Sequence, residues 1–464
     1  MTPEEALVAT VAEIAPEIKT LRLSPVKLAE AALARLETTG RKLNAVATLM
    51  RESALAEARA AEADITAGRY RGPLHGVPYG AKDLLAAKGA PTTWGAKPLL
   101  SQKFDEDAFV IKKLREAGAI LVGKLAMIEL AGGMGYNTAA ASATGPARNP
   151  WKTDCWTCGS SSGSGAAVAA GLVGFAIGSE TWGSIVCPSA FCGITGLRPT
   201  YGLVSRRGAM ALSFTMDKLG PMARSVEDCE LILEAIAGHD SEDPSSLSEG
   251  PPIALPPDVR AMRLGILRLD PKKGGDGEVF EAFEAAVKVF AGESLHLRDA
   301  ALPDLPFEPA AIAFITAEAA AAFEPLLSSG RNRQLVDPSA HVFPETSKTV
   351  TGADYVRAMQ ARRLMQAEMD KLFDTYDVLV SPSVPYLATK LSANLEKALP
   401  APDPLGAAGN VCGLPALSVP CGFSKSGLPI GMQVVGRALS EPKVLAVGRL
   451  YQEKTDWHKR RPTL

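Results

Sequence analysis

The 464-residue sequence has little net charge, few histidines and no long apolar run. Its 49 basic residues nearly balance 51 acidic ones, so composition gives no support for nucleic acid or a membrane surface as the main partner. The longest apolar run, residues 166–178, is too short to span a bilayer. The five histidines are scattered along the chain. The sequence therefore predicts no metal site, no cofactor and no Ser-His-Asp triad.

Cysteine is also scarce, with seven residues. The N-terminal segment MTPEEALVAT is acidic and lacks the basic region followed by an apolar region that is typical of a signal peptide. We therefore expect reduced thiols in a cytoplasmic protein. Cys155 and Cys158 form a C-x-x-C pair, but no second pair is spaced to complete a zinc site. Buried or loop thiols are the expected interpretation of this pair.

Helical and strand patterns alternate along the chain. We expect helices at residues 24–40, 109–118, 166–172 and 280–290, and strands at residues 119–122, 175–178, 264–267, 377–380, 416–419 and 432–435. This alternation predicts an α/β fold with a largely parallel or mixed sheet and helices on both faces. Residues 239–258 contain five prolines and several acids. They are interpreted as a surface loop within a single domain spanning residues 1–464, with an interdomain linker as the alternative.

Small residues and hydroxyls dominate residues 158–200. Glycines allow tight turns with inward-pointing N–H groups, and serines supply nucleophiles or proton relays. Residues 159–163 fit the G-x-S-x-G elbow pattern centred on Ser161. No Gly-Lys-Ser/Thr follows, which argues against a phosphate-binding loop.

This segment resembles the amidase signature family, serine hydrolases with a Ser–cis-Ser–Lys triad. Ser160 occupies the cis-serine position of the family pattern, and Ser184, 24 residues later, occupies the nucleophile position. Upstream, GVPYGAKD at residues 76–83 matches the family's lysine motif and places Lys82. Near the C-terminus, NVCGLPALSVP at residues 410–420 resembles a closing motif. The resemblance covers nearly the whole chain and implies a large mixed, twisted sheet sandwiched between helices.

The resemblance also implies a mechanism of amide hydrolysis. Ser184 would form an acyl-enzyme, the hydroxyl of Ser160 would carry the proton, and Lys82 would act as base. The Gly159–Ser160 peptide bond would be cis. The implied oxyanion hole consists of four backbone N–H groups, those of Thr181, Trp182, Gly183 and Ser184. Esters and carbamates (urethanes) pass through a similar tetrahedral intermediate, so they are also candidate substrates.

A lysine with its usual pKa of about 10.4 is almost always charged at neutral pH, so a lysine base must be desolvated. The apolar and small neighbours of Lys82 allow this. A carboxylate pointing at the amine would oppose it, and we therefore expect Asp83 to point away. His75 is near Lys82 in sequence, but the family uses lysine at this position and we do not expect the imidazole to take part.

Three positions depart from the family pattern. Glu180 replaces an aspartate, Trp182 replaces the glycine two residues before the nucleophile, and Val186 replaces the arginine two residues after it. If the family's acid and arginine form a buried ion pair, losing one alone would strand a charge. Trp182 places bulk beside the oxyanion turn and is expected to reshape the pocket wall. Other walls are expected from residues 307–345 and 127–136, although residues 310–323 fit a plain buried helix equally well.

These departures leave three functions open. The first is an active amide hydrolase that binds a small-molecule amide, ester or carbamate. The second is a glutaminyl-tRNA amidotransferase-type subunit, which passes ammonia to a tRNA-linked partner. The third is a non-catalytic binding or scaffold protein. The resemblance is compatible with a homodimer, and nothing in the sequence indicates nucleic-acid or membrane binding by the chain itself.

Overall fold

Eleven strands pair into one sheet in the computed structural model, which describes residues 1–248, 258–399 and 403–464. In chain order the strands are β1 (Val46–Leu49), β2 (Pro78–Lys82), β3 (Ile120–Leu125), β4 (Arg148–Asn149), β5 (Lys152–Trp156), β6 (Phe175–Glu180), β7 (Thr195–Arg198), β8 (Lys218–Ala223), β9 (Arg263–Ile266), β10 (His296–Asp299), β11 (Val378–Pro382), β12 (Ala416–Phe423) and β13 (Pro429–Gly436). The sheet order is β1-β3-β2-β6-β8-β7-β12-β13-β11-β9-β10, and β4 and β5 form a separate pair.

The large sheet is mixed, as predicted. Strands β3, β2 and β6 are parallel, and so are β11, β9 and β10. Each neighbouring pair between β6 and β11 is antiparallel, namely β6–β8, β8–β7, β7–β12, β12–β13 and β13–β11. Strands β1 and β3, at one edge, are also antiparallel. Two parallel units therefore flank an antiparallel centre.

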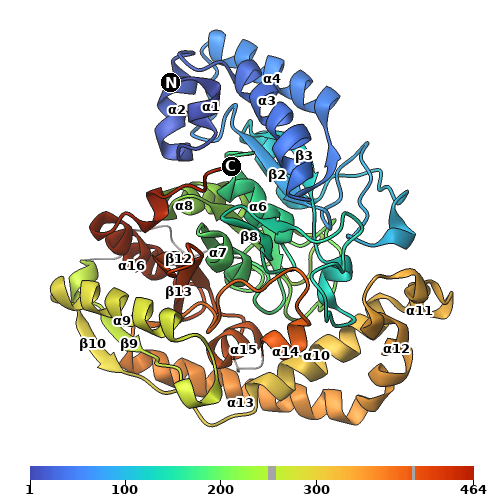
Figure 1. The fold of residues 1–464 in the computed structure, drawn as a ribbon, viewed down its shortest axis with the longest axis vertical. Coiled ribbons are helices and arrows are strands. Elements are labelled where there is room, and N and C mark those ends of the chain that lie inside the picture. Colours follow the sequence, from blue (N-terminus) through green and yellow to red (C-terminus); the bar gives the residue numbers. More distant parts are fainter. Residues whose placement is uncertain (249–257, 400–402) are drawn as a thin grey trace.

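Helices surround this sheet (Figure 1). The α-helices of the described residues are α1 (Pro3–Ala6), α2 (Val11–Lys19), α3 (Pro25–Arg35), α4 (Arg51–Thr66), α5 (Phe109–Glu116), α6 (Ser162–Ala169), α7 (Val186–Cys192), α8 (Val226–Ile236), α9 (Gly277–Gly292), α10 (Phe307–Ala322), α11 (Glu324–Ser328), α12 (Pro338–Thr346), α13 (Gly352–Thr375), α14 (Leu395–Ala398), α15 (Pro404–Val411) and α16 (Glu441–Lys454). Helices α1 to α4 lie at one end of the molecule, and α10 to α13 lie at the other. None of the helices in the described ranges is both long and apolar enough to cross a membrane.

Different helices cover the two faces of the sheet around β11. Successive side chains of a strand point to opposite faces. Leu379 packs in an apolar cluster with residues of α10, α13 and α15, whereas its neighbours Val378 and Val380 lie in another cluster with residues of α9 and α16. Helices α9 and α10 therefore lie on opposite faces, although they follow the adjacent strands β9 and β10.

The expected elements are confirmed with small shifts at their ends. The helix expected at residues 24–40 is α3 followed by a π-helical turn at Leu36–Gly40, and the Ser24 hydroxyl accepts the Lys27 N–H as its N-cap. All six expected strands coincide with β3, β6, β9, β11, β12 and β13. The expected small-residue helix begins four residues early, at Ser162.

The proline-rich segment is described in part. Residues 239–248 form turns and bends, and residues 249–257 lie outside the described residues. The prediction of a single domain, with this segment as a surface loop, stays a prediction.

Candidate active site

Three polar side chains form one hydrogen-bonded row inside the protein. Lys82 Nζ donates to Ser160 Oγ at 2.7 Å, and Ser160 Oγ donates to Ser184 Oγ at 2.9 Å. Lys82 and Ser160 are fully buried, whereas 6% of Ser184 is exposed. The Gly159–Ser160 peptide bond is cis. The row therefore leads from a fully buried amine to a hydroxyl on a residue that retains slight solvent exposure.

Strand order brings these residues together. Lys82 is the last residue of β2, which runs parallel to β6 with Ala81 opposite Ile177. Both strands end at the same edge of the sheet. In parallel sheets, ligand-binding sites commonly lie at the carboxyl ends of the strands. The turn after β6 carries Ser184, and the segment entering α6 carries Ser160.

Ser179, near the end of β6, is a site residue that the sequence patterns did not reveal. Lys82 Nζ donates to its Oγ at 2.9 Å, so the amine lies between two serine hydroxyls. Its only signal was its position near the C-terminal end of an expected strand. Ser161, the centre of the G-x-S-x-G pattern, has a different place: its Oγ donates to the Ser179 carbonyl at 3.2 Å and accepts the Ser179 N–H at 3.3 Å. Ser161 thus connects α6 to β6.

Burial lowers the pKa of Lys82 to about 7, although the negative charges of Asp217 and Glu180 partly oppose this effect. The lowering follows from removing the ammonium from water. Asp83 points away from the amine, as expected, because its carboxylate pairs with Lys124 Nζ at 3.0 Å. A substantial fraction of Lys82 is therefore neutral at neutral pH and able to accept a proton.

The turn from residue 181 to residue 184 presents backbone N–H groups. Gly183 has a φ of +81°, a left-handed conformation that glycine adopts without strain. No atom lies within 4 Å of the position that a Cβ on Gly183 would take, so the space there is open. Within the described ranges, the N–H groups of residues 181–184 donate to no protein acceptor. They are available to a bound oxyanion.

The Glu180 carboxylate holds the residues that follow this turn. Its Oε2 accepts the N–H groups of Ile185 and Val186 at 2.8 and 2.9 Å, and its Oε1 accepts from the Arg198 guanidinium at 2.7 Å. The Arg198 charge, together with these hydrogen bonds, outweighs burial and lowers the pKa of Glu180 to about 2. Arg198 in β7 thus supplies the positive charge that Val186 lacks. Glu180 is therefore not left as an unpaired buried charge.

Cys158 and Cys187 form a disulfide. The expectation that all thiols are reduced is wrong for this pair, because the fold brings together two cysteines that are 29 residues apart. Cys158 lies two residues before Ser160, and Cys187 lies three residues after Ser184. The bond therefore ties the two serine-bearing segments together. Cys155 is a buried free thiol, as expected.

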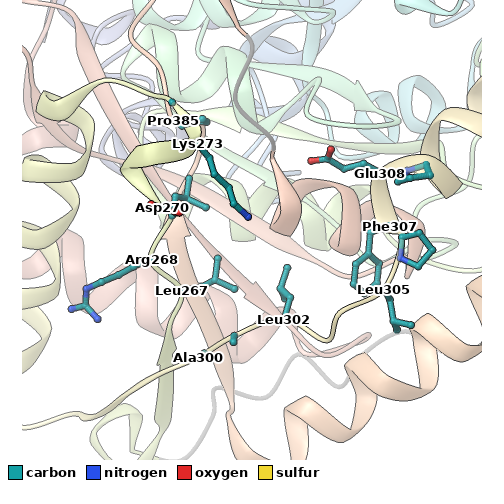
Figure 2. Close-up of a pocket in the computed structure, with 15 residues that line it drawn as sticks. Leu267, Arg268, Asp270, Lys273, Ala300, Leu302, Leu305, Phe307, Glu308 and Pro385 are labelled. Carbon is teal, nitrogen blue, oxygen red and sulfur yellow. The ribbon is translucent and has the colours of Figure 1, made fainter.

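Two cavities are relevant to substrate binding. One of about 200 Å³ is lined by Ser179 and Thr181 of the site, with Ala131 and Met210 among its walls. The other, of about 430 Å³, is lined by residues after β9 and β10, including Phe307 (Figure 2). The expected wall segments 127–136 and 307–345 contribute Ala131 and residues 307–309 to these two cavities, and residues 310–322 lie in the partly buried helix α10.

Neither a metal centre nor a histidine is indicated at the site. No group of three or more His, Cys, Asp or Glu residues that could hold a metal occurs in the described part of the chain. His75 is buried, accepts the Arg71 N–H at 3.1 Å and stacks on Tyr70.

A family model described as Amidase matches residues 27–445. The chain belongs to the amidase signature family. Among its curated relatives, a glutamyl-tRNA(Gln) amidotransferase subunit from Methylococcus capsulatus is 36% identical, with 98% of each chain covered.

Solved structures agree with membership of the amidase signature family. The peptide amidase from Stenotrophomonas maltophilia is 32% identical, with a TM-score of 0.85 and 98% of each chain covered. A 6-aminohexanoate cyclic dimer hydrolase bound to its substrate is 26% identical, with a TM-score of 0.86 over 98% of this chain and 99% of the other. The chain thus has the amidase signature fold, with matches that cover 98% of its length.

Proposed function

We propose that this chain hydrolyses small-molecule amides through an acyl-enzyme on Ser184. The observation that supports this proposal most strongly is the row of hydrogen bonds from Lys82 through Ser160 to Ser184. The open N–H groups of the neighbouring turn add a place for the developing negative charge.

In the acylation step, neutral Lys82 takes the proton of Ser160 while Ser160 takes that of Ser184. The Ser184 oxygen attacks the carbonyl carbon, and the carbonyl oxygen becomes an anion held by the turn. The proton on Lys82 then returns through Ser160 to the leaving nitrogen. The C–N bond breaks, the amine departs and an ester on Ser184 remains.

Deacylation uses the same groups with water as the nucleophile. Water attacks the ester carbonyl while its proton passes through Ser160 to Lys82. Collapse of the second tetrahedral intermediate breaks the bond to the Ser184 oxygen. That oxygen recovers its proton through Ser160, and the carboxylic acid leaves. The enzyme ends in its starting protonation state.

Esters and carbamates belong to the same proposal. Each presents a carbonyl that forms an equivalent tetrahedral intermediate, and acyl transfer from a carbamate leaves a carbamoyl or alkoxycarbonyl group on Ser184 that water removes. The cavity of about 200 Å³ beside Ser179 and Thr181 supports a small molecule rather than a polymer as substrate.

A second candidate function is that of an amidotransferase component. It is favoured by the 36% identity over 98% of both chains to the amidotransferase subunit from Methylococcus capsulatus. Such a component would release ammonia from glutamine and act with partner chains. Purification of the native protein from its own cells decides between the two: partner subunits and glutamine-dependent activity support the second candidate, and a lone chain active on amides supports the first.

A labelling experiment tests the acyl-enzyme directly. Phenylmethylsulfonyl fluoride should add one sulfonyl group to the protein, measured by intact mass, and Ser184→Ala should abolish the addition. Ser161→Ala is the matched control, because it removes the neighbouring serine of the G-x-S-x-G pattern and should leave labelling in place. Lys82→Ala should slow both labelling and amide turnover by about 10³-fold or more. Absence of labelling in the folded wild-type protein would favour a non-catalytic binding protein.

A further inference from the structure

The Trp182 side chain lies beside the nucleophile turn and is fixed in place. It is half-buried against the apolar cluster that contains Phe307 and Phe314. Its indole Nε1–H donates to Asp403 Oδ2 at 3.3 Å. The family pattern has glycine here, so this indole occupies volume that the pattern leaves empty.

Asp403 is itself held on two sides. Its Oδ1 accepts the Gly406 N–H at 3.0 Å as the N-cap of α15. Its own N–H donates to Glu308 Oε1, at the start of α10, at 3.0 Å. The indole is thus attached to two helices that lie on the same face of the sheet.

Glu308 also lines the cavity of about 430 Å³ (Figure 2). The cavity lies beyond the C-terminal ends of β9 and β10, whose following helices α9 and α10 lie on opposite faces of the sheet. Ligands of open α/β sheets bind in crevices at such positions. Leu267, Leu302 and Phe307 give it an apolar lining, and Lys273 points into it while Arg268 points away.

Trp182 and this lining share one apolar cluster. Leu267 and Phe307 are buried members of the cluster, and the partly buried side chains of Leu302, Leu305 and Trp182 pack against it. The indole is therefore linked to the lining of this cavity in two ways, through the shared apolar cluster and through its hydrogen bond to Asp403, whose N–H donates to Glu308.

We infer that the Trp182 side chain is the specificity-determining wall of the acyl site. It restricts Ser184 to short or flat acyl groups, and the cavity lined by Leu302 and Phe307 would accept a long alkyl chain once the indole is removed. This inference rests on the proposed acyl-enzyme at Ser184. Each methylene buried in an apolar cavity raises affinity about fourfold, so opening the wall should favour long chains steeply.

The test measures the rate of Ser184 labelling by straight-chain alkanesulfonyl fluorides from methane- to octanesulfonyl fluoride. The ratio of the octane to the methane rate should rise at least about tenfold in Trp182→Ala relative to wild type. Trp182→Phe retains a flat ring and should keep the wild-type order. Trp457→Ala, which removes an indole packed near Phe423 and Arg460, is the matched control and should change nothing.

A second substitution asks whether the chain enters this cavity. Leu302→Phe narrows the cavity and, added to Trp182→Ala, should return the ratio toward the wild-type value. If Trp182→Ala does not fold, Trp182→Leu keeps an apolar residue in the cluster and opens less space, with a smaller shift in the same direction.

The outcomes separate this inference from the proposed function. If no sulfonyl fluoride labels Ser184 in wild type, the acyl-enzyme proposal fails. If wild type is labelled but the Trp182→Ala and Trp182→Leu variants keep its chain-length order, the wall is elsewhere and this inference is overturned. If the octane-to-methane ratio rises in Trp182→Ala and adding Leu302→Phe does not lower it again, the assignment of this cavity to the alkyl chain is overturned.

Discussion

The Glu180 carboxylate and the Arg198 guanidinium lie 2.7 Å apart and are buried next to the turn that carries Ser184. The other carboxylate oxygen of Glu180 holds the N–H groups of residues 185 and 186, where α7 begins. One side chain therefore joins the end of β6, the strand β7 and the first turn of α7. The position of the nucleophile depends on this junction.

Replacing Glu180 by alanine should destabilise the protein by about 3–5 kcal/mol, because Arg198 is left buried without its partner. Misplacement of the turn by about 1 Å should also lower turnover roughly 100-fold. Urea unfolding and amide hydrolysis measure the two effects. Glu284→Ala, which breaks the exposed pair with Arg268, is the control and should shift stability by less than about 0.5 kcal/mol. Equal stability losses in the two variants would contradict a structural role for the buried pair.

Turnover should depend on pH through Lys82. Below a pKa of about 7 the amine is protonated and cannot act as base, so kcat/KM should rise with pH and level off above 7. Asp217→Asn removes a negative charge that raises this pKa and should move the rising limb to lower pH. Lys82 would be excluded as the base if kcat/KM did not change between about pH 5 and 9. It would also be excluded if Asp217→Asn moved the rising limb of the kcat/KM profile to higher pH.

Lys82 should also lower the stability of the fold at neutral pH. Its pKa is lower in the folded chain than in the unfolded chain, so the unfolded chain binds more protons between about pH 7 and 10 and stability rises with pH across that window. Below this window, burial of the charged Lys82 amine lowers the free energy of unfolding by about 5 kcal/mol. Lys82→Met should therefore be inactive yet more stable than wild type by several kcal/mol at about pH 6, with a smaller difference at about pH 9, in urea unfolding. A variant less stable at both pH values would contradict this.

The Cys158–Cys187 disulfide should stabilise both the fold and the site. Closing a loop across 29 residues contributes about 3–4 kcal/mol by restricting the unfolded chain. The double variant Cys158→Ala/Cys187→Ala should unfold at lower urea concentration and label more slowly at Ser184, and dithiothreitol should bring wild type to the same values. Cys155→Ala, at a free buried thiol, is the control. Two alkylatable thiols at these positions in native protein would show that the bond is absent.

The match to the family motifs was enough to predict that Lys82, Ser160 and Ser184 meet, because each motif has a fixed place in the family pattern. For residues outside those motifs, the sequence does not show which distant side chains meet. The Glu180–Arg198 pair and the Cys158–Cys187 bond arise when β6, β7 and α7 converge, and no local pattern marks them. Strand β2 was not expected because Pro78 and Gly80 disfavour strands. Pairing with β3 on one side and β6 on the other compensates for this.

The groups proposed to perform the reaction all come from residues 82–184, whereas the carboxylate that holds the indole and the residues of the large cavity come from residues 267–309, 385 and 403. The codons for the reactive groups and for Trp182 are thus separated in the gene from the codons for Asp403 and the large cavity. In a Trp182→Ala background, directed evolution confined to the cavity region should retarget the protein toward new amides. Every clone in the library keeps the same reactive serine, so a single activity-based probe reports which clones remain competent.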